Sequence, residues 1–198
     1  MEKKMSDCSK VSRAVVGVLA IFVLGQSARA DEPKKDWTIA YNFGATTDYV
    51  FRGVSQSAEK PAVQGGVDVT YKQFYAGIWI SNVDFTGSVP GPGVGVVEID
   101  YYAGIKFPVW KIDVDLGGIY YTYPGANDNF ALTGFKELDY FEFKAAAKYK
   151  IIDPLTVGAT VFFSPDGTNK TGQVWTFEST AEYVFPKFHT VTPRLCLR

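Results

Sequence analysis

Charged side chains recur at every second position in several segments of this sequence. The acids are Asp68, Glu98, Asp100, Asp113, Asp115, Glu142, Glu178 and Glu182, and the lysines are Lys106, Lys111, Lys144 and Lys148. Opposite charges in such a set can pair and fill the interior of a sheet, a ring of acids around water can favour cations, and two carboxylates can catalyse hydrolysis. Hydrolysis is disfavoured, because nothing in the sequence isolates two of these acids in an apolar pocket.

The chain offers few other groups for catalysis. His189 is the single histidine, and no serine partners it at a matching position, whereas serine hydrolases need a histidine base. Cys196 is the one cysteine beyond the first 30 residues, so we expect neither a disulfide nor a cysteine metal site. The sequence therefore predicts no enzyme, no metal and no cofactor.

The first 30 residues have the pattern of a secretory signal peptide. Four basic residues precede residues 14–25, an uncharged apolar run of twelve, and the small residues Ala28 and Ala30 follow it. A spanning helix needs about 20 apolar residues, so this run is too short to anchor the chain. We expect cleavage after Ala30 and export through the periplasm.

The remaining composition limits the partners. Removing residues 1–30 takes away five Lys or Arg and two Asp or Glu, which leaves 15 basic and 19 acidic residues and a formal charge of −4. This balance does not favour nucleic-acid binding. Beyond residue 30 no apolar stretch reaches the about 20 residues of a membrane helix. An aromatic content of 16% with 19 glycines is typical of an all-β chain with tight turns.

After a polar leader at residues 31–36, apolar and polar residues alternate in eight segments. These are residues 37–49, 61–71, 74–83, 95–107, 110–123, 138–150, 155–163 and 173–185. A period of two predicts strands. The alanine-rich centre of 138–150 also fits helical spacing, but the neighbouring strands favour a strand there too.

The connections between these segments alternate in length. The short ones are 72–73, 108–109, 151–154 and 186–187, and the long ones are 50–60, 84–94, 124–137 and 164–172. Outer-membrane barrels have short periplasmic turns and longer extracellular loops. The sequence therefore predicts that the chain enters the sheet from the periplasmic side.

Aromatic residues gather at both ends of the predicted strands. Those near the short turns are Trp37, Tyr71, Phe74, Phe107, Trp110, Tyr149, Phe185 and Phe188. Those near the long loops are Tyr49, Phe51, Phe85, Tyr121, Tyr123, Tyr140, Phe163 and Trp175. Aromatic girdles lie at headgroup depth on both sides of a bilayer, so we expect two girdles facing lipid.

These patterns predict an all-β, antiparallel, up-and-down transmembrane β-barrel over residues 37–198. A ninth run begins at residues 188–192, and we expect the sequence from Pro193 onward to break it. Nine is an odd number, whereas bacterial single-chain barrels have even numbers of strands. We therefore expect an incomplete barrel, truncated at its C-terminus, from a complete one of about 12 strands.

Several motifs also resemble a known family. They are Asp48–Ser57, Lys60–Gly66, Phe74–Phe85, Glu98–Gly104, Tyr120–Gly125 and Phe163–Asp166. Over residues 37–188 the chain resembles the TorF-like porins, uncharacterised proteobacterial envelope proteins. The resemblance implies an outer-membrane β-barrel with a pore function, and it brings no catalytic residues.

The first of these motifs predicts a structure at the mouth of the barrel. It contains Asp48, Arg52, Gly53 and Gln56. Arg52 cannot face hydrocarbon beside an interfacial aromatic residue, so we expect it to point inward and to pair with Asp48 or Asp84. Gly53 lets the chain turn sharply, so this loop can fold over the opening. The alternative is an arginine that only anchors a strand end.

The predicted function is a weakly cation-preferring channel for small hydrophilic solutes or ions, set in outer-membrane lipid. The oligomeric state is left open. Two alternatives remain: a structural or solute-binding barrel that does not conduct, and a soluble periplasmic β-sandwich that binds a ligand.

Overall fold

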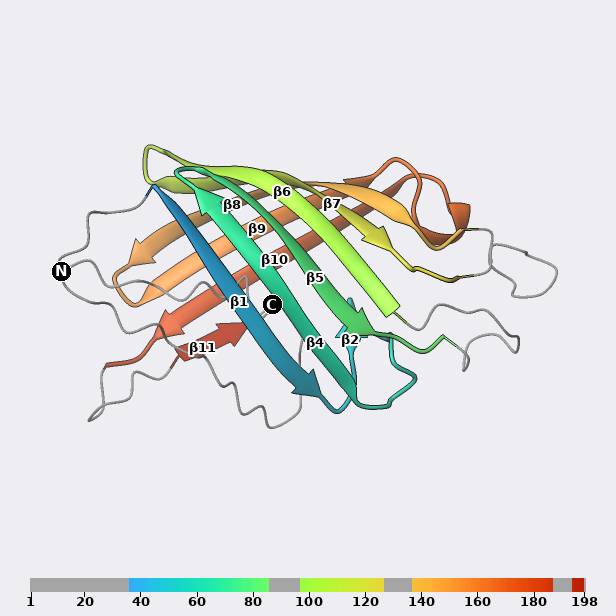
Figure 1. Ribbon diagram of the computed structural model, residues 1–198. Coiled ribbons are helices and arrows are strands. Elements are labelled where there is room, and N and C mark those ends of the chain that lie inside the picture. The colour runs from blue at the N-terminus through green and yellow to red at the C-terminus, as the bar shows by residue number, and fades with distance from the viewer. Residues whose placement is uncertain (1–35, 86–96, 127–136, 187–193, 198) are drawn as a thin grey trace.

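The computed structural model describes residues 36–85, 97–126, 137–186 and 194–197, and these form an all-β fold (Figure 1). The strands are β1 (Trp37–Thr46), β2 (Val50–Phe51), β3 (Val54–Ser55), β4 (Ala62–Tyr71), β5 (Phe74–Asn82), β6 (Val97–Val109), β7 (Ile112–Thr122), β8 (Tyr140–Ile152), β9 (Leu155–Ser164), β10 (Val174–Val184) and β11 (Arg194–Leu197). A short 3-10 turn, η2 (Thr168–Lys170), lies between β9 and β10. No helix in this part of the chain has the length and apolar character needed to cross a membrane.

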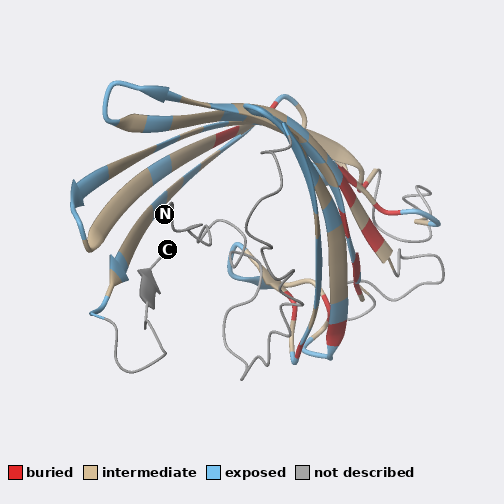
Figure 2. Ribbon diagram, turned by 60° about the vertical axis from the view of Figure 1, so that its left-hand side comes forward, coloured by how far each residue is buried: buried red, intermediate tan, exposed pale blue. Residues whose placement is uncertain are grey.

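Nine strands form one antiparallel sheet in the order β1-β4-β5-β6-β7-β8-β9-β10-β11. Each strand pairs with its neighbours along the chain, except that β2 and β3 form a separate hairpin. The large sheet bends into an arch, and the β2–β3 hairpin lies under it on the concave side (Figure 2). Strands β1 and β11 are the two ends of the strand order.

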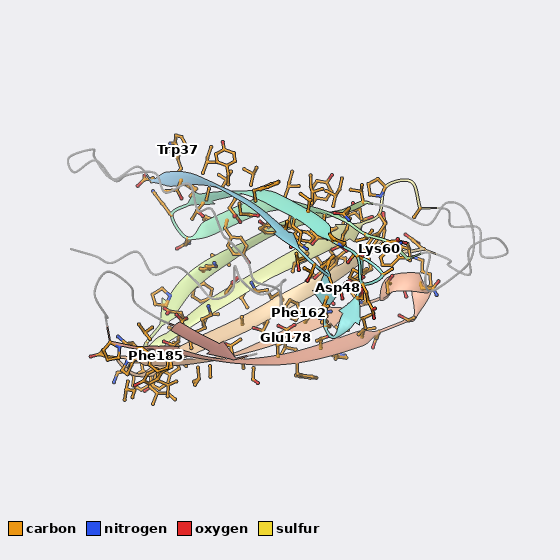
Figure 3. All side chains as sticks on the ribbon, turned by 90° about the horizontal axis from the view of Figure 1, so that it is seen from below. Trp37, Asp48, Lys60, Phe162, Glu178 and Phe185 are labelled. Carbon is orange, nitrogen blue, oxygen red and sulfur yellow. The ribbon has the colours of Figure 1, made fainter. Side chains whose placement is uncertain are left out.

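The alternation of residue types separates the two faces of the sheet. Large apolar side chains point away from the arch, as Trp37 does in Figure 3. Many of them are strongly exposed: Tyr41 and Phe43 on β1 by 74% each, and Phe177 on β10 by 73%. Residues of the opposite parity, such as Glu142 and Glu178, face the hairpin in the concavity. The convex face is therefore apolar, and the charged side chains lie on the concave face.

The side chains under the arch pack most tightly near the long loops. There Tyr49, Trp79, Val83, Tyr121, Tyr123 and Leu138 form a buried cluster with Ala62. Phe51 of β2 packs against this cluster and lies 5.9 Å from the ring of Tyr121. The cluster therefore joins the hairpin to the wall of the arch.

All eight predicted segments contain a strand, including the alanine-rich β8, but several boundaries were wrong, and β8 itself continues through Ile151 and Ile152 into the predicted turn. Strand β6 continues through Pro108 and Val109, and the turn lies at Trp110–Lys111, where Trp110 has a φ of 56°. A proline can occupy a strand end where no ladder donor is needed, so Pro108 did not mark the turn. The first segment ends at Thr46, and the predicted long loop 50–60 contains the β2–β3 hairpin.

Another correction concerns the end of the chain. We expected Pro193 and the residues after it to break the sheet, but Arg194–Leu197 form β11, which pairs antiparallel with Ala181–Val184 of β10. A proline removes only its own N–H donor, so a strand can begin directly after it. The signal peptide, leader residues 31–35, the run at 188–192 and His189 lie outside the described residues.

Candidate functional site

The charged residues of the concave face fall into two groups along the strands. The long-loop half holds Glu98, Asp100, Glu142 and Glu178, close to the strand ends that carry long loops. The short-turn half holds Asp68, Lys106, Asp113, Asp115, Lys144, Lys148 and Glu182. Residues that are far apart in the sequence lie at the same depth in the sheet, because neighbouring strands run in opposite directions.

The acids of the long-loop half are deeply buried. Glu98, Asp100 and Glu142 are at most 2% exposed. A buried carboxylate needs hydrogen bonds, because its desolvation is costly. The Tyr49 hydroxyl donates to Glu98 Oε1 at 2.9 Å, and the Tyr121 hydroxyl donates to Glu142 Oε2 at 3.1 Å. Interior tyrosines therefore orient the Glu98 and Glu142 carboxylates.

Arg52, at the tip of the hairpin, reaches the opposite wall of the arch. Its Nη1 and Nη2 donate to Glu142 Oε1 and Oε2 at 2.7 and 2.9 Å, and its Nε lies 3.6 Å from Glu178 Oε1. The guanidinium carbon lies 4.7 Å from the ring centroids of both Phe51 and Phe162. We call Glu142, Glu178, Phe162 and Tyr121 the Arg52 seat. Figure 3 places Phe162 and Glu178 beside the hairpin.

The ion pair also stabilises the charged form of Arg52. Burial alone would lower the pKa of this guanidinium, but the hydrogen bond to Glu142 and the negative charge of Glu142 raise the pKa above its ordinary value. Arg52 thus stays positively charged while its guanidinium lies in the seat. A bidentate arginine–carboxylate pair is both stronger and more directional than a single contact.

Polar contacts at the base of the hairpin direct Arg52 into the concavity. The Asp48 carboxylate accepts hydrogen bonds from Ser55 Oγ at 2.6 Å and Ser57 Oγ at 2.9 Å. The Gln56 backbone N–H donates to Tyr49 O at 2.6 Å. Gly53 has a φ of 83°, which closes the tip between β2 and β3. All four residues predicted at the mouth therefore belong to one turn structure.

The predicted partners of Arg52 were wrong. Asp48 holds the base of the hairpin instead, and Asp84 pairs with Lys60 Nζ at 2.7 Å. Both acids lie near the strand end from which the hairpin leaves, whereas the hairpin crosses the concavity. Arg52 therefore meets carboxylates of β8 and β10 rather than those of its neighbours in sequence.

The short-turn half contains paired charges. Lys144 Nζ donates to Asp115 Oδ2 at 2.7 Å, and the Tyr75 hydroxyl donates to Asp115 Oδ1, also at 2.7 Å. Lys106 Nζ lies 4.8 Å from the centroid of the Tyr75 ring. Asp113 and Lys148 are direct cross-strand neighbours. Opposite charges in such positions stabilise the strand pair.

The remaining predicted lining residues are placed as follows. Asp68 accepts a 2.7 Å hydrogen bond from the Tyr102 hydroxyl, and Glu182 lies opposite Thr156 on β9. Lys111 is an exception, because it occupies the β6–β7 turn, where its Nζ lies 5.2 Å from the Trp110 ring centroid. It therefore belongs to the rim and not to the concave strand surface.

Several interior aromatic residues were assigned to the wrong face or not identified. Tyr49, Tyr121 and Tyr123 were predicted in a lipid-facing girdle, but they are buried inside the arch. The alternation along β7 could have identified Tyr121 as an interior residue. Tyr121 is in phase with Asp113 and Asp115 and so must share their face. Phe162 alternates in phase with Thr160 and was not identified as part of the site.

Among the described residues, no group of three or more His, Cys, Asp or Glu could hold a metal ion.

Comparison with known proteins adds a family but no activity. A family model described as "Bacterial protein of unknown function (Gcw_chp)" matches residues 30–190. The chain belongs to the Gcw_chp family. The match covers both halves of the concave face and the Arg52 seat in this Gcw_chp protein. No curated protein matches the chain.

Proposed function

We propose that this protein is a porin-like channel of the outer membrane that passes small hydrophilic solutes or ions with a weak preference for cations. The observation that carries the proposal is the opposition of the two faces of the sheet. Exposed aromatic and aliphatic side chains extend across the convex face from β1 to β10, whereas acids and lysines line the concave face. An apolar surface of this extent is unfavourable in water and needs to be covered. Lipid can cover it without a partner protein.

A membrane location would also require a closed sheet. In lipid, every backbone N–H and C=O must be paired, so an open edge is excluded from the hydrocarbon region. The proposal therefore includes closure of the arch into a barrel, for which the sequence suggested about 12 strands. The up-and-down order of β1 to β11 and the resemblance to TorF-like porins support this architecture.

Cation preference follows from the charges of the long-loop half. Four acids lie there, and Arg52 is the basic side chain that contacts two of them. In the short-turn half, lysines and acids are more evenly matched and partly paired. Acidic groups around a water-filled passage attract cations and repel anions. Glu98, Asp100 and Glu142 are buried, so we infer that the net negative charge of the long-loop half, rather than direct contact of ions with these acids, sets the selectivity.

A barrel that does not conduct is the second candidate. The observation in its favour is the aromatic cluster of Tyr49, Trp79 and Tyr121, which occupies the interior near the long loops. If this packing extends across a closed barrel, solutes could enter from the short-turn end without crossing. The two candidates differ in one measurable property, which is conductance.

The test is the reversal potential of the purified protein in a planar bilayer under a salt gradient. We expect a sign that favours cations and a preference that weakens at high salt, because ions screen the acidic groups. An anion preference would contradict the charge argument. A lack of channel events from well-folded protein would favour the barrel that does not conduct.

A further inference from the structure

The Arg52 seat is formed by four consecutive strands. They contribute Tyr121 from β7, Glu142 from β8, Phe162 from β9 and Glu178 from β10. Phe162 lies opposite Lys144 on one side and Thr176 on the other, so it stands between the two acids on the concave face. These side chains therefore form a concave surface with two carboxylates beside one aromatic face, and none of them belongs to the hairpin.

The shape of this surface matches a planar cation. A guanidinium group has five N–H donors in a flat fork, and its faces stack on aromatic rings. In the seat, two nitrogens meet Glu142, the third faces Glu178, and the ring of Phe162 covers one face. An ammonium group is a compact point charge and cannot use these contacts together.

The group now in the seat is held by an unfavourable turn. Arg52 and Gly53 form the two-residue tip of the hairpin and have φ values of 49° and 83°. Two-residue turns with two positive φ values favour Asn, Asp or Gly, and a long side chain is uncommon in the first position. Strands β2 and β3 share only two residue pairs, so the backbone holds the tip weakly. The contacts of the Arg52 side chain must therefore offset the cost of this turn.

We propose that the Arg52 seat is a binding site for guanidinium-bearing cations and that Arg52 is its tethered occupant. A solute with a guanidinium group exchanges with Arg52, while Tyr121 keeps the Glu142 carboxylate oriented. The inference rests on the proposed channel only for the delivery of the solute. The shared chemistry is the guanidinium group, which free arginine and an arginine side chain of a short peptide both carry.

Binding is tested by calorimetry on the protein refolded in detergent, with L-arginine, L-lysine and L-citrulline as probes. Citrulline is a neutral analogue of arginine with nearly the same shape. We expect wild-type protein to bind arginine weakly and Arg52→Ala to bind it at least tenfold more tightly, since the tethered competitor is gone. Lysine should bind at least tenfold more weakly than arginine, and citrulline should not bind.

Two further variants make the test specific. Adding Glu142→Gln to Arg52→Ala should weaken arginine binding at least tenfold, whereas adding Lys60→Ala, at an exposed pair outside the seat, should not change it. If Arg52→Ala fails to fold, Arg52→Lys replaces it, because it keeps a charge but vacates most of the contacts. A Gly-Arg-Gly peptide that binds as well as arginine would assign the site to peptide side chains as well as to the free amino acid.

The inference is overturned if the vacated seat does not bind arginine, or if it binds lysine or citrulline equally well. This failure is separate from failure of the channel. Binding in detergent without channel events in a bilayer would keep the site and reject the channel. Channel events from a protein that does not bind arginine would reject the site and keep the channel.

Discussion

Arg52 places a positive charge among side chains that would otherwise form a buried anionic group. Its guanidinium contacts Glu142 and Glu178 from the far side of the concavity, and its side chain is 23% exposed. Since the arginine comes from the hairpin and the acids from the wall, this residue controls both the position of the hairpin and the local charge. Both effects should appear in the current through the proposed channel.

Replacing Arg52 with alanine should raise single-channel conductance and cation preference. The hairpin tip loses its anchor, and the acids lose their counter-charge. The free energy of unfolding should fall by about 1–3 kcal/mol, because a buried carboxylate loses its main donor. Conductance in a bilayer and the urea midpoint in detergent measure the two effects.

Arg52→Lys is the matched control for this prediction. It keeps the charge but loses the bidentate contact, so its selectivity should stay near that of wild type while its urea midpoint falls. Unchanged conductance and selectivity in a folded Arg52→Ala protein would leave Arg52 only the role of anchoring a strand end.

At this scale the sequence predicted which residues carry charge but not which residues meet. The inward direction of Arg52 followed from the cost of placing it in hydrocarbon. Its contacts with Glu142 and Glu178 did not, because they join positions that are 90 and more residues apart across a curved sheet. Sequence alternation gives the face of a residue, but it does not give the curvature that brings two strands opposite each other.

At the scale of the elements, glycine and tyrosine residues interlock on neighbouring strands. Gly77 on β5 lies directly opposite Tyr102 on β6, and Gly104 lies opposite Tyr75. A Cβ atom added at Gly77 would lie 2.5 Å from the Tyr102 hydroxyl oxygen. The missing side chain thus makes room for a ring whose hydroxyl donates to Asp68.

Gly77→Ala should therefore destabilise the sheet by about 1–3 kcal/mol, the usual cost of overpacking. Urea unfolding in detergent measures the loss. Gly44→Ala on β1 is the control, because nothing lies within 4 Å of the added atom, so its midpoint should hardly change. In the Tyr102→Ala background, Gly77→Ala should cost little. An equal loss in both backgrounds would contradict the interlock.

The strands themselves were the most predictable part of the fold. Period-two alternation identified β1 and β4 to β10, because the two faces of this sheet differ so strongly in polarity. The β2–β3 hairpin was missed because two-residue strands are too short to show a period. The turn at Trp110–Lys111 was missed because Pro108 is a common turn residue, and its tolerance at a strand end depends on the hydrogen-bond pattern.

At the scale of the whole molecule, the arch has an apolar outside and a charged inside. Several aromatic residues at the short-turn end are strongly exposed, such as Trp110 with 82% exposure. At the long-loop end, several predicted girdle residues turn inward and pack under the arch instead. The sequence could not separate these two positions by composition, because tyrosine suits both a membrane interface and a hydrogen-bonded interior.

The central proposal is that this protein forms a closed barrel in the outer membrane, and its migration on SDS gels tests this most directly. A closed sheet has no free edge from which detergent can unzip it, so the folded protein should resist SDS until it is boiled. We expect unboiled and boiled samples from the outer-membrane fraction to migrate differently. Identical migration, together with recovery of the protein in the soluble periplasmic fraction, would contradict the account.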